Sequence, residues 1–371
     1  MKVLLINSVC GIRSTGRICT DIAQELERQG HTVRIAYGRV EQVPQWAEKY
    51  AVPIGGAVSV ALHGARTRLL DDHGFGSVAA TRRFLRWAEE YDPELLWLHN
   101  LHGYYINIRL LFDWIRSRPQ MQVKWTLHDC WAFTGHCSHF DFVRCDKWQT
   151  GCHRCPQRAR YPKSLFWDRS RSNYLRKQAI FTGVKDLTLI TPSHWLAELV
   201  KQSFLGCYPV EVRHNTIDTE IFRPTQGNFR ATHGLSDVKL ILGVASAWSD
   251  RKGLQDFYQL SRCLDPDTRI LLVGLDQSQL QQLPPGILGL QRTNDVRQLA
   301  ELYTTADLFF NPTYEDTYPT VNLEAQACGA RVVTYRTGGA PETLYRPDAR
   351  VIDQGDWQRI PQILKETSKQ L

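Results

Sequence analysis

The segment from Asn311 to Gly329 has the residue types and spacing of an anion-binding site at the start of a helix. An apolar run at 306–310 predicts a short buried strand, and the polar loop after it leads to Pro319 and Thr320, which suit a first helical turn. A helix start leaves backbone N–H groups unpaired and carries partial positive charge. We therefore expect this helix start to favour a phosphate group.

Three carboxylates flank the same helix start. Glu315 and Asp316 stand in the loop before the helix, and Glu324 stands about one turn inside it. An ionised carboxylate only accepts hydrogen bonds, so Glu324 could hold two neighbouring hydroxyls, as on a ribose. Backbone amides that bind phosphate and carboxylates that bind hydroxyls would together suit a nucleotide diphosphate sugar. The alternative is an ordinary capped helix with Glu324 solvated.

A second candidate for phosphate binding is the pair Arg251 and Lys252. The pair stands in the loop between an apolar strand predicted at 238–245 and a helix predicted at 254–263. Loops that follow strands in open α/β sheets are common ligand sites, and cations there can hold a phosphate. The alternative is a solvated charged loop.

Two histidines follow predicted strands in the first half of the chain. His102 lies just after a strand at 93–99, and His128 lies directly after a strand at 122–127. The carboxyl ends of strands are where open α/β sheets bind ligands, and an imidazole there could serve a substrate. Otherwise these histidines are ordinary hydrogen-bonding residues at strand ends.

Alternating strands and helices predict an α/β fold with two doubly wound domains. The 371 residues allow two cores, and we expect domains at 1–205 and 206–371. The predicted strands are 2–7, 31–37, 93–99, 122–127, 187–191, 210–213, 238–245, 268–274, 306–310 and 331–335. The predicted helices are 18–29, 78–90, 108–116, 195–203, 254–263, 295–303 and 357–371.

Composition favours a globular protein without a membrane span. Hydrophobic residues make up 43% and charged residues 22%, and no apolar run reaches the roughly 18 residues that a spanning helix needs. The apolar start at 2–6 is too short for a secretion signal and is followed by no small-residue cleavage site. We therefore expect a cytoplasmic protein.

Half of the ten cysteines are clustered. Five lie between residues 130 and 155, where clustering in a reducing compartment favours a metal over disulfides. The pair Cys152 and Cys155 has the spacing of half a tetrahedral zinc site, and Cys137 and Cys145 can supply the other half. Cys130 is a fifth candidate, and His136, His139 and His153 are possible substitutes.

A structural zinc would also explain how this segment folds, because it holds little hydrophobic material for its length. The alternatives are an iron–sulfur cluster and free thiols. Four thiolates would leave no open position on the metal, so we do not expect a catalytic metal here.

The positive charge of the chain is concentrated at 144–177. This stretch holds ten Lys or Arg and two Asp, which accounts for the whole net charge of +7. Aromatic residues are interleaved with the cations, and such a mixture suits a membrane interface or a phosphate-bearing partner. The alternative is a solvated basic loop. Nucleic acid is not expected, because no recognition motif accompanies the charge. The aromatic residues are Trp148, Tyr161, Phe166, Trp167 and Tyr174.

The motifs in this order resemble a family 4 glycosyltransferase over nearly the whole chain. They are Cys10–Gly16, Gly30–Val33, Thr126–Asp129, Asn215–Asp218 with Phe222 and Pro224, Lys252–Gly253, Asn311–Gly329 and Gly338–Glu342. The resemblance implies two Rossmann-like domains that face a cleft, the GT-B arrangement, with an acceptor-side domain first and a nucleotide-sugar domain second. The Cys-rich segment at about 130–156 would be an insert in the first domain.

The resemblance also assigns roles to individual residues. The two acids of the family motif fall on Asp316, where the family has Glu, and on Glu324. Lys252 matches the phosphate-binding lysine. The arginine that usually precedes it is replaced by Ser246 and Ala247, and Arg251 would compensate. His128 would lie near the transferred sugar. Further donor contacts would come from Tyr318, Thr320, Val321, Asn322 and Ser246, and acceptor-side contacts from Gly11, Thr15, Gly16 and His102.

The run from Thr126 to Pro156 is similar to transferases of the colanic-acid type, which extend lipid-linked exopolysaccharide or O-antigen units. That similarity favours Cys137, Cys145, Cys152 and Cys155 as zinc ligands. It implies retaining transfer from a UDP- or GDP-sugar to a polyprenyl-diphosphate-linked glycan, without a catalytic metal. The stretch 144–177 would then bind the anionic inner face of the plasma membrane.

Two other classes of protein remain open from the sequence. One is an NAD-dependent oxidoreductase, although the loop at 8–16 lacks the full glycine fingerprint of a dinucleotide site. The other is a non-catalytic binding protein with a zinc module.

Overall fold

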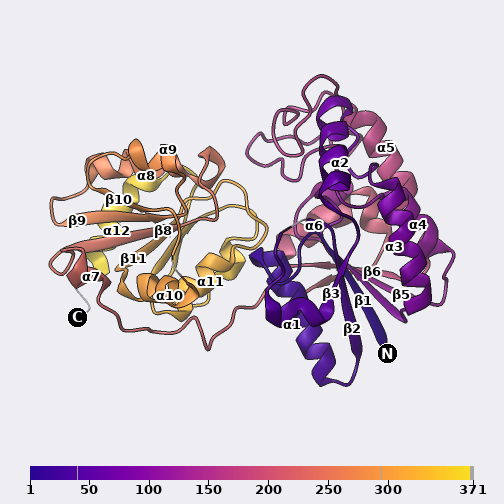
Figure 1. Cartoon of the computed structure of the whole chain (residues 1–371). Coiled ribbons are helices and arrows are strands. Elements are labelled where there is room, and N and C mark those ends of the chain that lie inside the picture. Colours follow the sequence, from indigo (N-terminus) through magenta and orange to yellow (C-terminus); the bar gives the residue numbers. More distant parts are fainter. Residues whose placement is uncertain (40, 294, 368–371) are drawn as a thin grey trace. The chain divides into compact units, whose positions relative to one another are not determined.

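The computed structural model describes residues 1–39, 41–293 and 295–367. The chain divides into two compact units, Met1–Arg213 and His214–Leu371 (Figure 1). The sequence places this division between residues 205 and 206. The last strand of the first sheet, Val210–Val212, follows that point, which is why the first unit extends to Arg213.

The first unit is built on a parallel sheet of seven strands in the order β3-β2-β1-β4-β5-β6-β7. Helices pack on both faces of this sheet, as Figure 1 shows. The strands are β1 (Lys2–Asn7), β2 (Thr32–Tyr37), β3 (Ala51–Pro53), β4 (Leu95–Leu98), β5 (Gln122–Thr126), β6 (Leu187–Thr191) and β7 (Val210–Val212). The helices are α1 (Arg13–Arg28), α2 (Ala57–Leu70), α3 (Val78–Tyr91), α4 (Ile108–Arg116), α5 (Ser170–Phe181) and α6 (His194–Gln202).

The second unit is built on a parallel sheet of six strands in the order β10-β9-β8-β11-β12-β13. The strands are β8 (Lys239–Val244), β9 (Thr268–Val273), β10 (Ile287–Leu290), β11 (Leu308–Asn311), β12 (Val332–Tyr335) and β13 (Arg350–Ile352). The helices are α7 (Phe229–Thr232), α8 (Leu254–Leu260), α9 (Gln277–Gln281), α10 (Val296–Thr305), α11 (Thr320–Ala327) and α12 (Ile360–Thr367). The tail helix predicted at 357–371 begins with a 3₁₀ turn at Trp357–Arg359 and continues as α12, and residues 368–371 lie outside the described part.

Each sheet reverses its strand order once. In the first unit the reversal lies between β1 and β4, and in the second it lies between β8 and β11. In open α/β sheets ligands bind in the crevice at this point, beyond the carboxyl ends of the strands. The topology therefore marks one candidate binding edge in each unit, and the predicted α/β class with two Rossmann-like units is confirmed.

The central strands are buried on both faces, which is why they read as continuous apolar runs. Val3–Ile6 and Leu240–Leu242 are almost fully buried. The strands that the sequence does not predict are β3, β10 and β13, and all three lie at a sheet edge. Edge strands are short and only partly covered, so their sequences lack the buried pattern. No helix among the described residues is long and apolar enough to cross a membrane.

Candidate functional site

The strand reversal in the second unit brings together a cation and an acid that the sequence separates by 64 residues. Lys252 follows β8, and its Nζ lies 2.5 Å from Oδ2 of Asp316 in the loop after β11. Both side chains are about one-fifth exposed, so the pair is reachable from solvent. A partly exposed ion pair at this edge can exchange its internal partner for a charged ligand.

The neighbouring residues Arg251 and Glu315 form a second pair, in which the acid is buried and the arginine is exposed. Arg251 Nε lies 3.8 Å from Glu315 Oε2, and the Glu315 side chain is only 2% exposed. The backbone N–H of Tyr314 also donates to the carbonyl of Arg251 at 2.9 Å. These contacts hold the two loops in register. They leave Asp316 as the more accessible of the two acids.

A glycine allows the close approach of these loops. Gly253 has a φ of +74°, and a Cβ added to it would lie 2.2 Å from the carbonyl oxygen of Pro312. A side chain there would therefore push apart the loops that carry Lys252 and Asp316. The Lys-Gly sequence is explained by this contact as well as by the charge of the lysine.

A carboxylate bonded to two phenols ties the same loop to its supporting elements. Asp256 on α8 accepts hydrogen bonds from the hydroxyls of Tyr314 (2.9 Å) and Tyr335 (2.7 Å). Burial raises the pKa of Asp256, although both hydrogen bonds favour its ionised form. This arrangement fixes Tyr314 next to the Glu315–Asp316 pair, so the loop is preorganised.

The helix start predicted at Thr320 is present, because α11 begins there. Within the helix, the hydroxyl of buried Tyr303 donates to Oε2 of Glu324 at 2.9 Å. Glu324 itself is half-buried. Tyr303 belongs to α10 and carries no motif that the sequence analysis could use. It orients a carboxylate that the sequence did identify.

The other predicted donor contacts lie in different environments. Asn322 is fully buried, where its side chain accepts from Asn311 (2.9 Å) and donates to Thr343 (2.9 Å), so this side chain holds the loops together. Tyr318 is nearly buried and stacks on His214, with ring centroids 4.9 Å apart. Ser246 is exposed after β8. Thr320 and Val321 are half-buried at the start of α11.

The glycine segment after β1 is a tight turn that runs directly into a helix. The N–H of Gly11 donates to the carbonyl of Gly16 at 3.2 Å, and Asn7 Nδ2 lies 3.5 Å from Thr15 Oγ1. The helix begins at Arg13, so Thr15 and Gly16 belong to its first turn and the predicted start at residue 18 is wrong. No side chain caps this helix start, which explains why its sequence gives no start signal.

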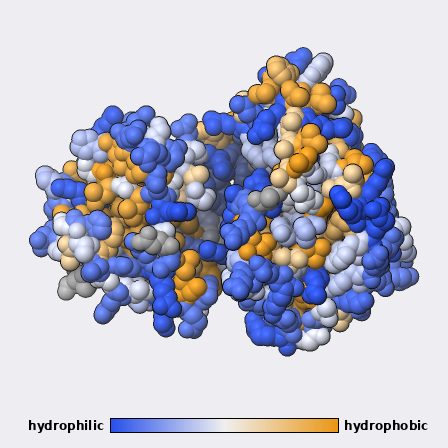
Figure 2. Space-filling view, viewed as in Figure 1, coloured by the Kyte–Doolittle hydropathy of each residue, from blue (hydrophilic) through white to orange (hydrophobic). Residues whose placement is uncertain are grey.

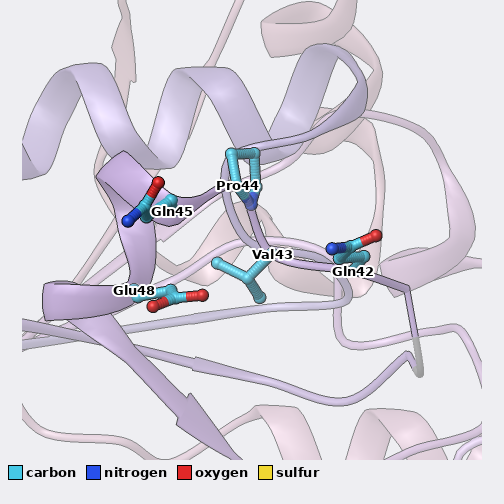
Figure 3. Close-up of a pocket in the computed structure, with 5 residues that line it drawn as sticks. All are labelled: Gln42, Val43, Pro44, Gln45 and Glu48. Carbon is cyan, nitrogen blue, oxygen red and sulfur yellow. The ribbon is translucent and has the colours of Figure 1, made fainter.

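A cavity lies in the segment that packs against this turn. It has a volume of about 530 Å³ and is lined by Gln42, Val43, Pro44, Gln45 and Glu48 (Figure 3). A Cβ at Gly11 would lie 2.9 Å from Ala47 Cβ, so the turn and this segment are in close contact. None of the predicted site residues lines the cavity.

The two histidines beyond β4 and β5 form a pair. His128 Nε2 lies 3.0 Å from Nδ1 of the buried His99. Burial lowers the pKa of His128 to about 4 and also lowers that of His99, so both rings are neutral near pH 7. His128 can therefore act as a hydrogen-bonding group and not as a cation.

A second histidine at this edge contacts an acid and a phenol. His102 Nε2 lies 2.8 Å from Oδ2 of Asp129, and His102 Nδ1 lies 3.0 Å from the hydroxyl of Tyr161. Burial acts to raise the pKa of Asp129, but the His102 ring and the N–H of Trp131 outweigh it and hold that pKa well below its usual range. The sequence predicted His102 for this edge but gave no reason to connect it with Tyr161.

Near this edge, the buried neutral ring of His63 should make the stability of the first unit depend on pH. Its Nε2 accepts from the N–H groups of Gly74 and Gly76, both at 3.2 Å, which requires the neutral ring. Burial lowers the pKa of His63 to about 4. Between pH 6.5 and 4 the unfolded chain binds a proton that the folded chain does not. Stability should therefore fall as the pH falls, by roughly 1.4 kcal/mol per pH unit for each such histidine.

Urea unfolding of the first unit at several pH values measures this slope. His63→Gln should be less stable than the wild type near pH 7 and should show a shallower slope. An unchanged slope in His63→Gln would contradict the assignment.

The Cys-rich segment brings the four predicted zinc ligands around one small cavity. Cys137, Cys145, Cys152 and Cys155 line it, and its volume is about 10 Å³. All ten cysteines are free thiols. Among residues 1–39, 41–293 and 295–367, no three ligand atoms from this segment lie within 4.8 Å of one another. The predicted zinc site is therefore not confirmed.

The thiols nevertheless differ in their environment. Cys137 and Cys155 share a hydrogen bond, which raises the pKa of Cys137 and lowers that of Cys155 to about 7. Burial raises the pKa of Cys152 to about 11, and its Sγ accepts the N–H of Gly135 at 3.2 Å. Nε2 of His136 is buried beside the cavity and has no hydrogen-bond partner among the described residues.

The segment is less dependent on a metal than its composition indicates. Trp131, Phe133, Phe140 and Trp148 are buried in the main core of the first unit. Lys177 is also fully buried, and it donates to the carbonyls of Trp131 (2.7 Å) and Thr134 (3.0 Å). The expectation that this segment has little hydrophobic support is wrong, because its aromatic residues pack inward.

The basic stretch 144–177 is accordingly split between core and surface. Lys177, Trp148 and Tyr174 are buried, whereas Phe166 and Trp167 are 68% and 59% exposed. On the surface, the backbone N–H of Leu165 donates to the carbonyl of Arg68 on α2 at 2.8 Å. Val58, Leu62 and Leu69 on α2 are also exposed, and Figure 2 shows orange apolar atoms in this region at the top. We call Val58, Leu62, Leu69, Leu165, Phe166 and Trp167 the α2–insert patch.

Comparisons with known proteins found relatives that match nearly the whole chain. The chain is 22% identical over 98% of its length to a colanic acid biosynthesis glycosyl transferase, WcaC, of Escherichia coli K12, and it spans 90% of that protein. Among solved structures, sucrose-phosphate synthase from Thermosynechococcus elongatus has a TM-score of 0.69 at 15% identity, covering 100% of this chain and 90% of that one. Anabaena HepE in complex with UDP-glucose has a TM-score of 0.63 at 14% identity, with the same coverage.

Two family models match the chain. The model described as "Glycosyl transferases group 1" matches residues 238–366. The model described as "Glycosyltransferase Family 4" matches residues 15–221, which is more than half of the chain. The chain therefore belongs to glycosyltransferase family 4.

Proposed function

We propose that this glycosyltransferase transfers a sugar, with retention of anomeric configuration, from a UDP- or GDP-sugar bound by the second unit. The observation that carries the donor site is the Lys252–Asp316 pair at the strand reversal, next to the start of α11. The UDP-glucose bound to HepE supports a nucleotide-sugar donor in this fold.

The chemistry assigned to each residue follows from its charge. Lys252, Arg251 and the first amides of α11 would stabilise the charge of the departing diphosphate. Asp316, released from Lys252 when the diphosphate binds, would accept hydrogen bonds from the donor sugar, with Glu315 fixed behind it. Glu324, oriented by Tyr303, would hold the ribose hydroxyls. These groups supply the donor-side charge, so the proposal includes no catalytic metal.

Nucleotide-sugar binding is tested by thermal melting with UDP-sugars, GDP-sugars and NAD. At 100 times its Kd, the true donor should stabilise the protein by about 2.7 kcal/mol. A shift with NAD alone would instead support an oxidoreductase, and no shift with any nucleotide sugar would support a non-catalytic protein.

Glu324→Ala should weaken donor binding about 10- to 100-fold, because a hydrogen bond to a charged group contributes about 1.5–3 kcal/mol. Titration calorimetry with the donor found by melting measures this loss. Glu220→Ala is the matched control in the same unit, since its side chain is 88% exposed. A Glu324→Ala variant with wild-type affinity would refute the ribose assignment.

The acceptor we propose is a polyprenyl-diphosphate-linked glycan at the inner face of the plasma membrane. The likeness to a colanic acid transferase supports it. The α2–insert patch supports membrane docking, because Val58, Leu62 and Leu69 lie on one face of α2 and exposed cations surround the insert side. Apolar side chains bordered by cations fit an anionic lipid surface. The exposed cations on the insert side are Arg160 and Lys163.

Replacing both Phe166 and Trp167 with Asp should lower binding to anionic liposomes at least 30-fold, because even one of the two buried rings contributes about 2 kcal/mol. Cosedimentation with phosphatidylglycerol vesicles measures the effect. Trp46→Asp is the control, since Trp46 is 51% exposed outside the patch. Binding that depends neither on the content of anionic lipid nor on the salt concentration would contradict the proposal.

We also propose that Cys137, Cys145, Cys152 and Cys155 bind a structural zinc ion. Their shared cavity is close to the smallest volume that holds one water, which fits a single ion better than an iron–sulfur cluster. The N–H of Gly135 aimed at Cys152 and the lowered pKa of Cys155 favour a thiolate, whereas burial raises the pKa of Cys152 and the hydrogen bond with Cys155 raises that of Cys137. Zinc would draw the four sulfurs together.

A further inference from the structure

Lys177 on α5 is a buried cation that the donor chemistry does not use. Its side chain is fully buried, and its Nζ donates to the carbonyls of Trp131 at 2.7 Å and Thr134 at 3.0 Å. The same Nζ lies 3.5 Å from the centroid of the Trp131 ring. These contacts give the ammonium hydrogen-bond acceptors and an aromatic face, but they bring no formal negative charge. A fully buried charge is costly unless an opposite charge lies near it.

Two acids favour the charged form of Lys177, but neither forms an ion pair with it among residues 1–39, 41–293 and 295–367. Asp129 and Asp71 act on the ammonium only at longer range. Asp71 is already engaged, because it lies 2.6 Å from His136 Nδ1 and accepts the N–H of Arg169 at 2.7 Å. In the described part of the chain, the ammonium therefore has no directly bonded counter-charge.

One peptide group connects Lys177 to the Cys-rich cluster. The carbonyl of Thr134 accepts from Lys177, and the N–H of Gly135 in the same peptide group donates to Sγ of Cys152 at 3.2 Å. A hydrogen bond to the carbonyl polarises the peptide group and strengthens the hydrogen bond that its N–H donates. The positive charge of Lys177 therefore acts on Cys152 through this peptide group.

This connection depends on a glycine. A Cβ added to Gly135 would lie 2.0 Å from the carbonyl oxygen of Ser170 and 2.8 Å from Cβ of Cys152. Ser170 is the first residue of α5, the helix that carries Lys177. A larger residue at 135 would push the peptide group away from both the helix and the sulfur. The close packing at Gly135 thus keeps the cation, the peptide group and the thiol in contact.

Metal binding would give the cluster the negative charge that Lys177 needs nearby. Cys137, Cys145, Cys152 and Cys155 line one cavity. Four neutral thiols that bind one zinc ion release four protons and leave a complex with a double negative charge. Burial lowers the pKa of Lys177 to about 7, and negative charge on Cys152 or Cys137 raises it. The anionic complex and the buried ammonium would therefore stabilise each other.

We propose that Lys177 is the internal counter-cation of the metal–thiolate cluster and raises the affinity of the cluster for the metal. The inference rests on the zinc site proposed above and adds a residue outside the set of ligands. Lys177 is not itself a ligand, because an ammonium group has no lone pair. It is a positioning residue that acts through the peptide group between Thr134 and Gly135.

The affinity of the full chain for zinc, measured by competition with a chelating dye, tests the proposal. Lys177→Gln removes the charge but keeps an N–H donor for the two carbonyls, and Lys177→Met removes both. Each variant should bind zinc about 10- to 100-fold more weakly than wild type, the usual effect of losing an outer-shell partner of a metal site. Lys163→Met is the control and should keep the wild-type affinity, since Lys163 is an exposed lysine of the same basic stretch.

The stability of the zinc-free protein separates a charge effect from a structural one. Urea unfolding in the presence of a chelator measures it for each variant. Lys177→Gln should unfold close to wild type without zinc and still lose zinc affinity. A zinc affinity of Lys177→Gln within about twofold of wild type would overturn the counter-cation, as would a loss of affinity no larger than its loss of zinc-free stability. If Lys177→Met fails to fold without zinc, Lys177→Gln decides the matter.

The same measurements distinguish failure of the zinc site from failure of the counter-cation. A folded wild-type protein that binds no zinc would overturn the zinc site and, with it, the role of Lys177. A wild-type protein that binds zinc no more tightly than either Lys177 variant would overturn only the counter-cation.

Discussion

Lys252→Ala is expected to lower kcat/KM for the nucleotide sugar by about 100- to 1000-fold, the range found when one preorganised charge-stabilising group is removed. The diphosphate gains negative charge as the bond to the sugar breaks. Lys252 stands at the strand reversal with its charge partly shielded from solvent, where its attraction to that group is stronger than in bulk water. Much of the loss should appear in kcat, because the charge develops in the transition state.

The pairing of Lys252 with Asp316 predicts in addition how a second substitution should change donor binding. An alanine at 252 also leaves Asp316 without its 2.5 Å partner, and that carboxylate would then repel the diphosphate. Lys252→Ala combined with Asp316→Asn should therefore bind the donor more tightly than Lys252→Ala alone. Arg251 does not replace Lys252 as the partner of Asp316, because its Nε lies 3.8 Å from Glu315 Oε2.

Steady-state kinetics with the donor found by melting decide the matter. Lys239→Ala is the matched control, since this lysine is on β8 of the same unit and its Nζ lies 3.8 Å from Asp267 Oδ2. If the activity of Lys252→Ala were within about threefold of wild type, the diphosphate would not bind at this edge of the sheet.

The second large effect is expected in the Cys-rich insert. Purified protein should carry about one equivalent of zinc, and Cys152→Ser should lose most of it, because a serine hydroxyl is a poor ligand for zinc in place of a thiolate. Four thiolates cannot gather around one small cavity without a cation, since their mutual repulsion is strong where water is excluded. The free energy of metal binding should therefore stabilise the folded insert.

The buried aromatic residues of the insert limit this effect. Trp131, Phe133 and Phe140 hold part of the segment in the core without metal. Cys152→Ser or chelation should thus loosen the insert and leave the sheet folded. Hydrogen exchange across 130–169 measures the loosening, and elemental analysis measures the metal.

Exposed Cys207→Ser is the control, because it lies outside the cluster and should keep the full zinc content. Less than about half an equivalent of zinc in a protein whose insert is folded would refute the zinc site. Free thiols held apart by their hydrogen bonds would then be the correct description.

Much of the fold could be read from local patterns. The central strands are apolar because both faces are covered, so β1, β8 and β11 were predicted close to their observed positions. The edge strands β3, β10 and β13 were missed, because a strand with one neighbour needs no continuous apolar run. The start of α1 was missed because no capping side chain marks it.

The residues of the candidate site were predicted, whereas most of their contacts were not. Lys252, Asp316, Glu324, His102 and His128 were predicted because each follows a strand or opens a helix, and strand ends in parallel sheets share an edge. Their partners are set by contacts between distant segments. Nothing local links Tyr303 to Glu324, or Tyr161 to His102 and Asp129.

The sequence by itself determined the two parallel sheets, the edge of each sheet at which chemistry can occur, and the residue types available there. Only the tertiary structure decided which of those residues touch. In the structure, Lys177 is buried although it belongs to a basic stretch, and Asn322 is buried as well. Tyr161 of the insert contacts His102 at a strand end. The physical reason is that periodicity reports which face of an element is buried, whereas a hydrogen bond between side chains depends on the packing of elements that are far apart in the chain.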